Sequence, residues 1–368
     1  MDIIKRISES TKSIYPIEKL APVDDILFID IETTGFTARS SKLYLIGCVY
    51  YKDSVCNTIQ FFADNYDDES EILSAFFEFS KDFKVLIHFN GNNFDIPYLE
   101  QKAKQLGLPY TFDTFVGIDI YKRIAPLKKV LMLENCKQKT IERFLGVERE
   151  DKYSGGDLIG IYNDFVTNQD AEAKRLLLLH NFDDICGMVK ILPILAYSDL
   201  FVDKLTVSKV SANYFTDVSG TARSELLMAV ELSSELVTPV SFRYDQCYFT
   251  AAGSKGMLRV PLFTGELKYF YANYKDYYYL PAEDVAIHKS VAEYVDKNRR
   301  EQAKASNCYT RRESTYIPQW DALVTPFFKP DYNSGTLYWE LTDERRTDRE
   351  LFSQYVTHVL EHFVRSAK

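Results

Sequence analysis

The feature that most constrains this chain is a pair of acidic residues inside a stretch that otherwise has the character of a buried strand. The sequence FIDIETTGF, residues 28–36, carries Asp30 and Glu32 between isoleucines. Residues two apart on a strand point to the same face of a sheet, so the two carboxylates are expected to lie side by side. Burying unpaired carboxylates costs several kcal/mol each unless a cation or hydrogen-bond donors compensate. The pair therefore predicts a divalent cation beside this strand.

The segments around this strand predict an α/β fold with a mixed sheet. Strand-like segments and segments with apolar residues at helical spacing follow one another in the order βββαβαβ, and further helices come after them. The first three strands favour an antiparallel meander, and the whole order favours a five-stranded mixed sheet with helices on its faces. The expected strands are 26–35, 43–51, 58–63, 84–89 and 116–124, and the expected helices are 67–83, 97–107, 138–147 and 157–195.

Length and composition predict two domains in a globular protein. A chain of 368 residues exceeds the size that one core usually supports. A change of character near residue 200 divides it into a first domain, 1–200, and a smaller α+β domain, 201–368, whose role the sequence does not indicate. In the second domain we expect helices over 282–305 and 348–366. We find no uninterrupted apolar run long enough to cross a membrane, so a cytoplasmic location without membrane contact is expected.

Charge and cysteine usage exclude some classes of protein. The six cysteines include no C-x-x-C pair, which argues against a zinc ribbon and favours reduced, mostly buried thiols. The formal net charge of −9 argues against a protein that coats nucleic acid by bulk attraction, although it does not exclude a nuclease.

Two further motifs extend the acidic pair into a constellation. The segment HFNGNNFDIPYL, residues 88–99, places Asp95 near the carboxyl end of a buried strand, where ligand crevices of α/β sheets lie. The segment HNFDDI, residues 180–185, places His180 and Asp184 four apart, on the same side of a helix. Hard divalent cations prefer oxygen ligands, and two ions about 4 Å apart need shared carboxylates. The motifs together predict a site for two divalent ions.

In order and local context, Asp30, Glu32, Asp95 and Asp184 resemble the four acids of the DEDD (DnaQ-like) 3′-5′ exonuclease superfamily. FIDIETTG resembles its first motif, FNGNNFDIPYL resembles the second motif of family B polymerase proofreading domains, and the run as far as HNFDDI most resembles the YprB-like branch. The resemblance covers roughly residues 20–200. It implies a ribonuclease H-like fold, two Mg²⁺ or Mn²⁺ ions, and hydrolysis of DNA or RNA from a single-stranded 3′ end.

The third motif departs from the superfamily pattern. His180 has the spacing to Asp184 at which the superfamily carries a tyrosine. The resemblance implies that His180 orients or deprotonates the attacking water, and the alternative is a structural or solvent-facing histidine. Asp183 is one residue away from the expected ligand and should point about 100° around the helix.

Residues next to these motifs are candidates for contacting substrate. The backbone after the first motif and the ring of Phe36 can hold a terminal nucleotide, the ring by stacking. The expected substrate-binding residues are Thr33, Thr34, Gly35, Phe36, Asn90 and Asn93. A basic run either tracks the substrate phosphates or forms a solvated face. It consists of Lys122, Arg123, Lys128, Lys129, Lys137, Lys139 and Arg143.

Other readings of single motifs stay open. Asp95 can cap a helix without any metal, and the tyrosine-rich segment 274–280 can be core rather than a stacking surface. HVLEH, residues 358–362, has the form of an inverted zinc-protease motif, but a carboxylate ligand well downstream is missing, so we interpret it as coincidence. The sequence thus predicts a metal-dependent 3′-5′ exonuclease. The alternative is a non-catalytic nucleic-acid-binding or interaction protein with the same fold.

Overall fold

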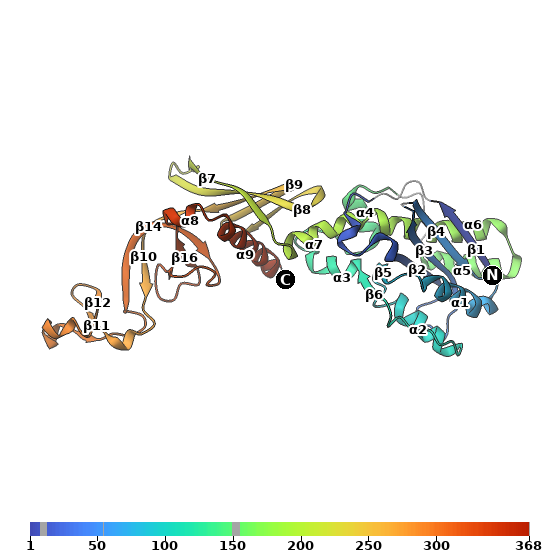
Figure 1. Ribbon diagram of the computed structural model, residues 1–368, viewed down its shortest axis with the longest axis horizontal. Helices are drawn as coiled ribbons and strands as arrows, with labels where there is room; N and C mark the ends of the chain where they lie inside the picture. Colours follow the sequence, from blue (N-terminus) through green and yellow to red (C-terminus); the bar gives the residue numbers. More distant parts are fainter. Residues whose placement is uncertain (8–12, 54, 149–154, 368) are drawn as a thin grey trace. The chain divides into compact units, whose positions relative to one another are not determined.

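The computed structural model of the chain describes residues 1–7, 13–53, 55–148 and 155–367. The chain divides into two compact units (Figure 1). The first unit comprises residues 1–202 and 233–238, and the second comprises residues 203–232 and 239–367.

The first unit contains a six-stranded mixed sheet in the order β1-β4-β3-β2-β5-β6. Its strands are β1 (Asp2–Ile7), β2 (Ile26–Thr33), β3 (Leu43–Lys52), β4 (Val55–Phe62), β5 (Val85–His88) and β6 (Val116–Asp119). Strands β1 to β4 pair antiparallel, whereas β2, β5 and β6 run parallel to one another. The expected meander and mixed sheet are confirmed. The sheet has six strands rather than five because β1, whose side chains are mostly exposed, carries no apolar alternation and is held by backbone pairing to β4.

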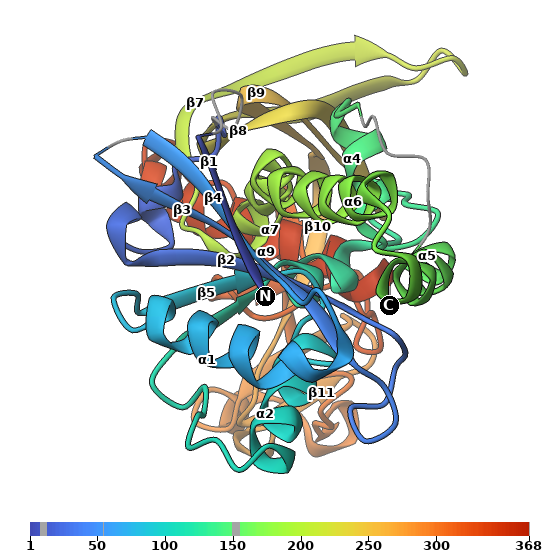
Figure 2. The ribbon, with the colours of Figure 1, turned by 90° about the vertical axis from the view of Figure 1, so that its right-hand side faces the viewer.

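Helices cover both faces of this sheet. Helix α1 (Glu69–Ser80) packs on one face, and α5 (Gly155–Asn168) and α6 (Ala171–Lys190) lie on the other (Figure 2). The other helices of the unit are α2 (Asp95–Gln105), α3 (Ile120–Ile124), α4 (Gln138–Leu145) and α7 (Leu195–Val202). This arrangement confirms the predicted α/β class.

Neighbouring residues on β4 fill the two layers of the core. Phe61 packs edge-on against Phe76 of α1. Phe62 packs edge-on against Tyr162 and Phe165 of α5. Because successive strand residues point to opposite faces, these contacts assign α1 and α5 to opposite sides of the sheet. All five rings are almost fully buried, so both layers gain the large stabilisation of buried aromatic area.

The strand expected over residues 116–124 is wrong in its second half. Strand β6 ends at Asp119, and residues 120–124 form helix α3. The side chain of Asp119 accepts a hydrogen bond from the backbone N–H of Lys122 at 3.3 Å, which caps the helix at its start. A capping aspartate thus converts a segment of strand-like composition into a helical turn.

The helical stretch Ala171–Val202, which includes α6 and α7, is long and apolar enough to cross a membrane by length and composition alone. The sequence search for uninterrupted apolar runs missed it because charged residues divide it. Its most apolar window has a mean hydropathy of 1.7, and 72% of that window is buried within the protein. Such burial is typical of a core helix in a globular protein.

In its described residues, the second unit consists mostly of strands in three sheets. The first sheet contains β7 (Thr206–Thr216), β8 (Ala222–Tyr244) and β9 (Cys247–Pro261). The second contains β10 (Phe263–Phe270), β14 (Tyr309–Gln319), β16 (Leu337–Glu340) and β15 (Phe327–Phe328). The third contains β12 (Val285–His288), β11 (Tyr277–Leu280) and β13 (Glu301–Gln302). Helices α8 (Asp343–Arg346) and α9 (Arg349–Ala367) follow, so the helix expected over 348–366 is confirmed.

The helix expected over residues 282–305 is wrong. Residues 285–288 form β12, which pairs antiparallel with β11 from Tyr277 opposite His288 to Leu280 opposite Val285. Residues 301–302 pair with the other edge of β11. This pairing satisfies the backbone groups of β11 on both sides, and it outweighs the local helical spacing, which is only a weak preference.

Helix α6 lies close against the sheet at Gly47. In β3, Gly47 pairs with Asp30 of β2 on one side and with Gln60 of β4 on the other. A Cβ atom at Gly47 would overlap the side-chain amide of Asn181, which is fully buried. The missing side chain at Gly47 therefore makes room for Asn181 against the sheet.

We predict that Gly47→Ala lowers the free energy of unfolding by about 1–3 kcal/mol, because the added methyl group overpacks the space that Asn181 fills. The measurement is urea unfolding followed by circular dichroism. Gly160→Ala is the matched control, since a Cβ at this position of α5 meets no atom within 4 Å. It should instead stabilise the helix, by up to about 1 kcal/mol. Equal stability of Gly47→Ala and the wild type would contradict the close approach of α6.

Candidate active site

The predicted site residues converge near the carboxyl ends of the parallel strands. Asp30 and Glu32 lie on β2, and Asp95 is the first residue of α2, which follows β5. His180 and Asp184 lie one turn apart on α6. The structure thus brings together three segments that are far apart in the sequence.

Three of these residues form a compact cluster. The Nε2 atom of His180 lies 3.1 Å from Oδ2 of Asp184 and 3.5 Å from Oε1 of Glu32. One ligand atom from each of the three residues lies within 4.8 Å of those of the other two. The side chains of His180 and Glu32 are only 5% and 12% exposed. The two carboxylates at these distances can hold a divalent cation, and the imidazole lies within reach of the same position.

Asp30 lies beside this cluster in an environment of concentrated negative charge. Burial raises the pKa of Asp30 well above its ordinary value, and the carboxylates of Asp184, Asp95 and Glu32 raise it further. The Nδ2 group of Asn181 donates a hydrogen bond to Oδ2 of Asp30 at 3.0 Å, which opposes that rise. Among the described residues, Asp30 forms no ion pair. A cation beside Asp30 would relieve this repulsion.

Asn181 is a site residue that the sequence analysis missed. Its Oδ1 accepts a hydrogen bond from Nε2 of Gln60 at 2.9 Å, and the same nitrogen donates to the carbonyl oxygen of Leu178. Asn181 therefore connects α6 to β4 and, through its Nδ2 group, to Asp30 on β2. Only its position next to His180 points to Asn181 in the sequence. A search for acidic metal ligands does not identify an uncharged amide.

Asp95 is buried and contacts the backbone of β2. Its Oδ1 accepts a hydrogen bond from the N–H of Ile31 at 3.2 Å, and burial raises its pKa to about 7. The N-cap residue of α2 is Phe94 and not Asp95. The carboxylate therefore links the start of α2 to β2, between Asp30 and Glu32.

Asp119, at the end of β6, is a second site residue that the sequence analysis missed. Its carboxylate accepts hydrogen bonds from the backbone N–H groups of Asn90 at 2.9 Å and Asn92 at 3.3 Å. Its negative charge also raises the pKa of Asp95. Asp119 thus holds the turn between β5 and α2 in place. The strand-like composition of residues 116–124 gives no sign of this capping role.

The predicted substrate-binding residues lie at the rim of the site. Phe36 is 90% exposed, and its ring contacts Phe94 edge-on with 6.2 Å between the centroids. The Oγ1 of Thr33 donates to the carbonyl oxygen of Gly35, whereas Oγ1 of Thr34 accepts from the backbone N–H of Lys42. These bonds fix the turn that presents Phe36 to solvent.

The predicted residues Asn90 and Asn93 are in contact on the turn after β5. The Nδ2 group of Asn93 donates to Oδ1 of Asn90 at 2.7 Å. Asn90 has a φ of 63°, a left-handed conformation that asparagine adopts more readily than most residues. This turn places polar side chains beside the acidic residues.

A groove of about 560 Å³ adjoins the site. It is lined by Asn90, Lys128, Lys137 and Gln138, among others. The Nε2 group of Gln138 donates a hydrogen bond to the backbone carbonyl oxygen of Asp184 at 3.0 Å, which connects the groove to the acidic cluster. The groove therefore carries two lysines, and Gln138 joins it to the backbone of α6 at Asp184.

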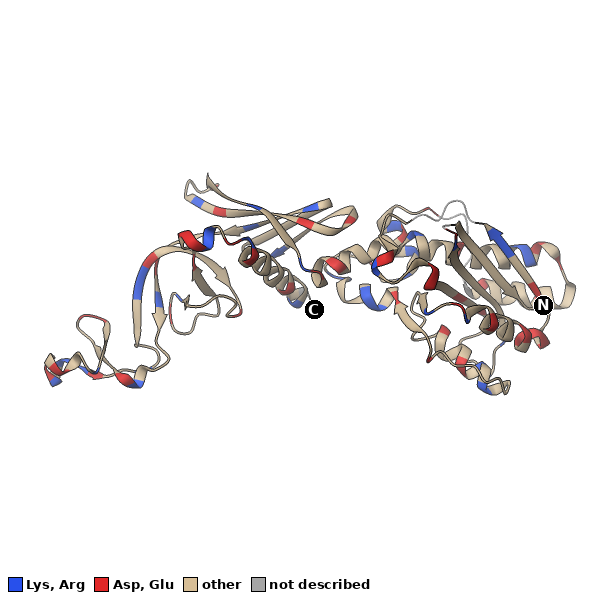
Figure 3. Cartoon of the chain, in the orientation of Figure 1, with Lys and Arg blue, Asp and Glu red and all other residues tan. Residues whose placement is uncertain are grey.

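The basic run does not act as a single surface. Lys128 and Lys137 line the groove, whereas Arg143 pairs with Glu134 across 3.7 Å, and both of those side chains are about three-quarters exposed. Basic and acidic segments are interspersed over both units (Figure 3). Part of the run is thus a solvated face, in which ion pairs contribute little.

Comparisons with known proteins gave one family match and one similar structure. A family model of the RNase_H superfamily matches residues 27–196. Among solved structures, the family B DNA polymerase from the hyperthermophilic archaeon Pyrobaculum calidifontis matches with 19% sequence identity and a TM-score of 0.38. That match covers 48% of this chain and 26% of the polymerase chain. No curated protein matches. The family match and the sheet order together identify the first unit as a ribonuclease H-like domain.

We predict that, without a bound cation, the protein becomes less stable as the pH rises from about 4 to about 7. The pKa of Asp95 is about 7 in the folded protein against an ordinary value of 3.8, so the unfolded chain binds fewer protons in this window. Asp95→Asn keeps an acceptor for the N–H of Ile31 and should remove the share of the decrease that Asp95 causes. The measurement is urea unfolding in chelator across this window.

Asp113→Asn, at an exposed position, is the matched control for this prediction. It should leave the loss of stability with rising pH unchanged. Mg²⁺ should reduce the loss of stability with rising pH in the wild type, because a cation favours the charged carboxylates. An identical pH dependence of stability in the wild type and in Asp95→Asn would contradict the raised pKa.

Proposed function

We propose that this protein is a metal-dependent 3′-5′ exonuclease that hydrolyses phosphodiester bonds of DNA or RNA. The observation that carries the proposal is the cluster of Glu32, His180 and Asp184, whose ligand atoms lie within 4.8 Å of one another. Asp30 and Asp95 lie beside it, with their pKa values raised by burial. A ribonuclease H-like domain with this concentration of acids supports a nuclease.

The donor set fits two divalent ions. Asp30, whose carboxylate is crowded by three other acids, would be shared between them, while Glu32 and Asp184 would hold one ion and Asp95 would support the other. Bound Mg²⁺ or Mn²⁺ would supply a hydroxide nucleophile and stabilise the leaving oxygen. Carboxylate oxygens are the ligands that both of these ions prefer.

The residues of the chain have distinct roles in this proposal. Asn181 orients Asp30 through its hydrogen bond, and Gln60 in turn orients Asn181. His180, whose Nε2 lies between the carboxylates of Glu32 and Asp184, takes up a proton from the attacking water. In this proposal His180 is the general base, at the position relative to Asp184 where the DEDD superfamily carries a tyrosine.

The rim residues suit a single-stranded end. Phe36 presents an almost fully exposed ring on which a terminal base can stack, and such stacking tolerates any base. Lys128 and Lys137 in the groove can contact phosphates of the strand as it approaches the acids. Neither contact selects between DNA and RNA, so the proposal includes both substrates.

We predict that the purified protein shortens 3′-overhanging or single-stranded substrates one nucleotide at a time in Mg²⁺ or Mn²⁺ and not in chelator. Asp30→Asn and Asp184→Asn should each abolish this release, because each removes a carboxylate from the cation site. The measurement is the product ladder from 5′-end-labelled single-stranded DNA and RNA on a denaturing gel.

Asp183→Asn is the matched control on the same helix and should keep most of the activity, because Asp183 points about 100° away from Asp184. Binding of the oligonucleotide without any shortening, in either metal, would instead favour the non-catalytic nucleic-acid-binding protein. Undiminished release by both Asp30→Asn and Asp184→Asn would remove the proposed mechanism.

We predict that the double variant Lys128→Ala/Lys137→Ala binds single-stranded oligonucleotides more weakly and with less salt dependence. Loss of two phosphate contacts should reduce the slope of log K against log salt by up to about 1.4, since each contact on a single strand contributes about 0.7. Arg143→Ala is the matched control, because Arg143 pairs with Glu134 outside the groove. Fluorescence anisotropy in chelator measures binding without cleavage, and equal slopes for the two variants would contradict a phosphate path in the groove.

A further inference from the structure

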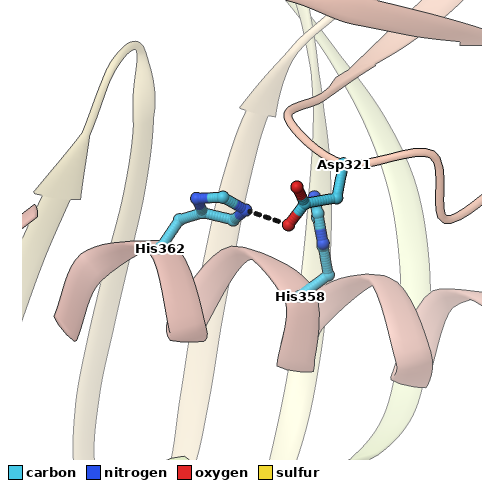
Figure 4. Close-up of side chains that lie close together, drawn as sticks. All are labelled: Asp321, His358 and His362. Carbon is cyan, nitrogen blue, oxygen red and sulfur yellow. Dashed lines mark hydrogen bonds and ion pairs between the residues drawn. The ribbon is translucent and has the colours of Figure 1, made fainter. Parts of the chain in front are cut away.

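A second cluster of side chains that can act as metal ligands belongs to the second unit. His358 and His362 lie on α9, and Asp321 follows β14 (Figure 4). One ligand atom from each of the three residues lies within 4.8 Å of those of the other two. Both histidines are buried, whereas the side chain of Asp321 is 62% exposed. The cluster therefore has a buried imidazole pair and a carboxylate that is open to solvent.

One pair in this cluster has the separation of two ligands in a tetrahedral metal site. Residues four apart lie on the same side of a helix, so both imidazoles project from one face of α9. The Nε2 atom of His362 lies 3.2 Å from Oδ2 of Asp321. Two ligand atoms bound about 2.05 Å from one zinc ion at the tetrahedral angle lie about 3.3 Å apart. The two atoms of this pair therefore already have the separation of two ligands of one ion.

The imidazole of His358 offers a ligand nitrogen to the same region. Its Nε2 accepts a hydrogen bond from the backbone N–H of Trp320, the residue before Asp321, at 3.3 Å. A nitrogen that accepts this bond carries a lone pair rather than a proton, and a cation binds to such a lone pair. Since the bond to Trp320 is long, a bound cation can replace this weak donor at Nε2.

Arg365 is the group that competes with a cation for Asp321. Its Nη1 lies 3.1 Å from Oδ2 of Asp321, while its Nη2 lies 3.2 Å from Oε2 of Glu361. Among the described residues, none donates a hydrogen bond to Oδ1 of Asp321. Because Glu361 also holds Arg365, the carboxylate can turn either oxygen toward a cation while the guanidinium keeps an ion-pair partner.

We propose that His358, His362 and Asp321 form a binding site for Zn²⁺. Two imidazoles and one carboxylate are a zinc donor set, whereas Mg²⁺ prefers a site made of oxygens alone. With three protein ligands the fourth position is left to water or another small ligand. Binding through Nε2 requires the tautomer of His362 that carries its proton on Nδ1, so that proton moves from Nε2 to Nδ1 by way of solvent.

Aromatic rings enclose the histidine side of this site. Trp320 stacks on His358 with 5.9 Å between the centroids, and Tyr244 stacks on His362 at 5.4 Å. These contacts hold the two imidazoles in fixed orientations before any cation binds. Preorganised ligands lose little conformational entropy on binding, which favours a tight site.

The experiment measures Zn²⁺ bound to the full chain by equilibrium dialysis and elemental analysis. Asp30→Asn/Asp184→Asn serves as the background, so that the acidic site of the first unit contributes no strong binding. We expect one equivalent of Zn²⁺ in this background, and we expect it to be lost on adding His358→Gln, His362→Gln or Asp321→Asn. His288→Gln is the matched control, because His288 lies on β12 and, among the described residues, its side chain hydrogen-bonds only to Ser290.

A second measurement needs no change at the zinc site. X-ray absorption at the zinc edge, on the Asp30→Asn/Asp184→Asn protein, should give a four-coordinate ion with two imidazole ligands. Circular dichroism of Asp321→Asn, the least buried of the three positions, separates lost binding from lost folding. Three outcomes would each overturn the proposal. They are retention of the Zn²⁺ equivalent by all three variants, absence of bound Zn²⁺ in the background protein, and a spectrum without imidazole ligands. These readouts do not depend on nucleotide release. They therefore test the zinc site independently of the proposed nuclease.

Discussion

Mutual repulsion among carboxylates is the constraint around which the first unit is arranged. Asp30 is surrounded by the charges of Asp184, Asp95 and Glu32, and burial increases the cost of ionising all of them together. Asn181 is the neutral donor that reduces this cost for Asp30. It reaches Asp30 because Gly47 leaves space between α6 and β3. A glycine in one strand thus determines how closely an amide approaches an acid in the next.

The fold of the first unit could be predicted where burial and side-chain pattern agree. Strands β2 and β3 consist largely of buried apolar residues, and their pairing follows the expected meander. Strand β1 exposes most of its side chains, so its place at the sheet edge depends on backbone hydrogen bonds. Such bonds form with any side chain and cannot be recognised in the sequence. The errors at α3 and β12 have a similar cause, since a cap in one case and strand pairing in the other outweighed local propensity.

The predicted acids of the candidate site converge, whereas the groups that orient them were not predictable from one-dimensional spacing. Asp119 supports the turn after β5 only because β5 and β6 are neighbours in the sheet. Gln60 contacts Asn181 only because β4 lies under α6. Asp321 comes 41 residues before His362, so a search for a downstream ligand of HVLEH could not find it. Charged motifs are visible in a sequence, but the neutral and distant residues around them become visible only in the folded chain.

The origin of His180, Asn181 and Asp184 on one helix has a consequence for assembly. Their mutual spacing comes from the α-helical repeat of 3.6 residues, so it exists as soon as α6 forms and does not await the sheet. Asp30 and Glu32 are likewise spaced by their strand alone. The acids of the helix and of the strand are therefore brought together when α6 packs on β2, and Asp95 joins them from α2 through its bond to Ile31.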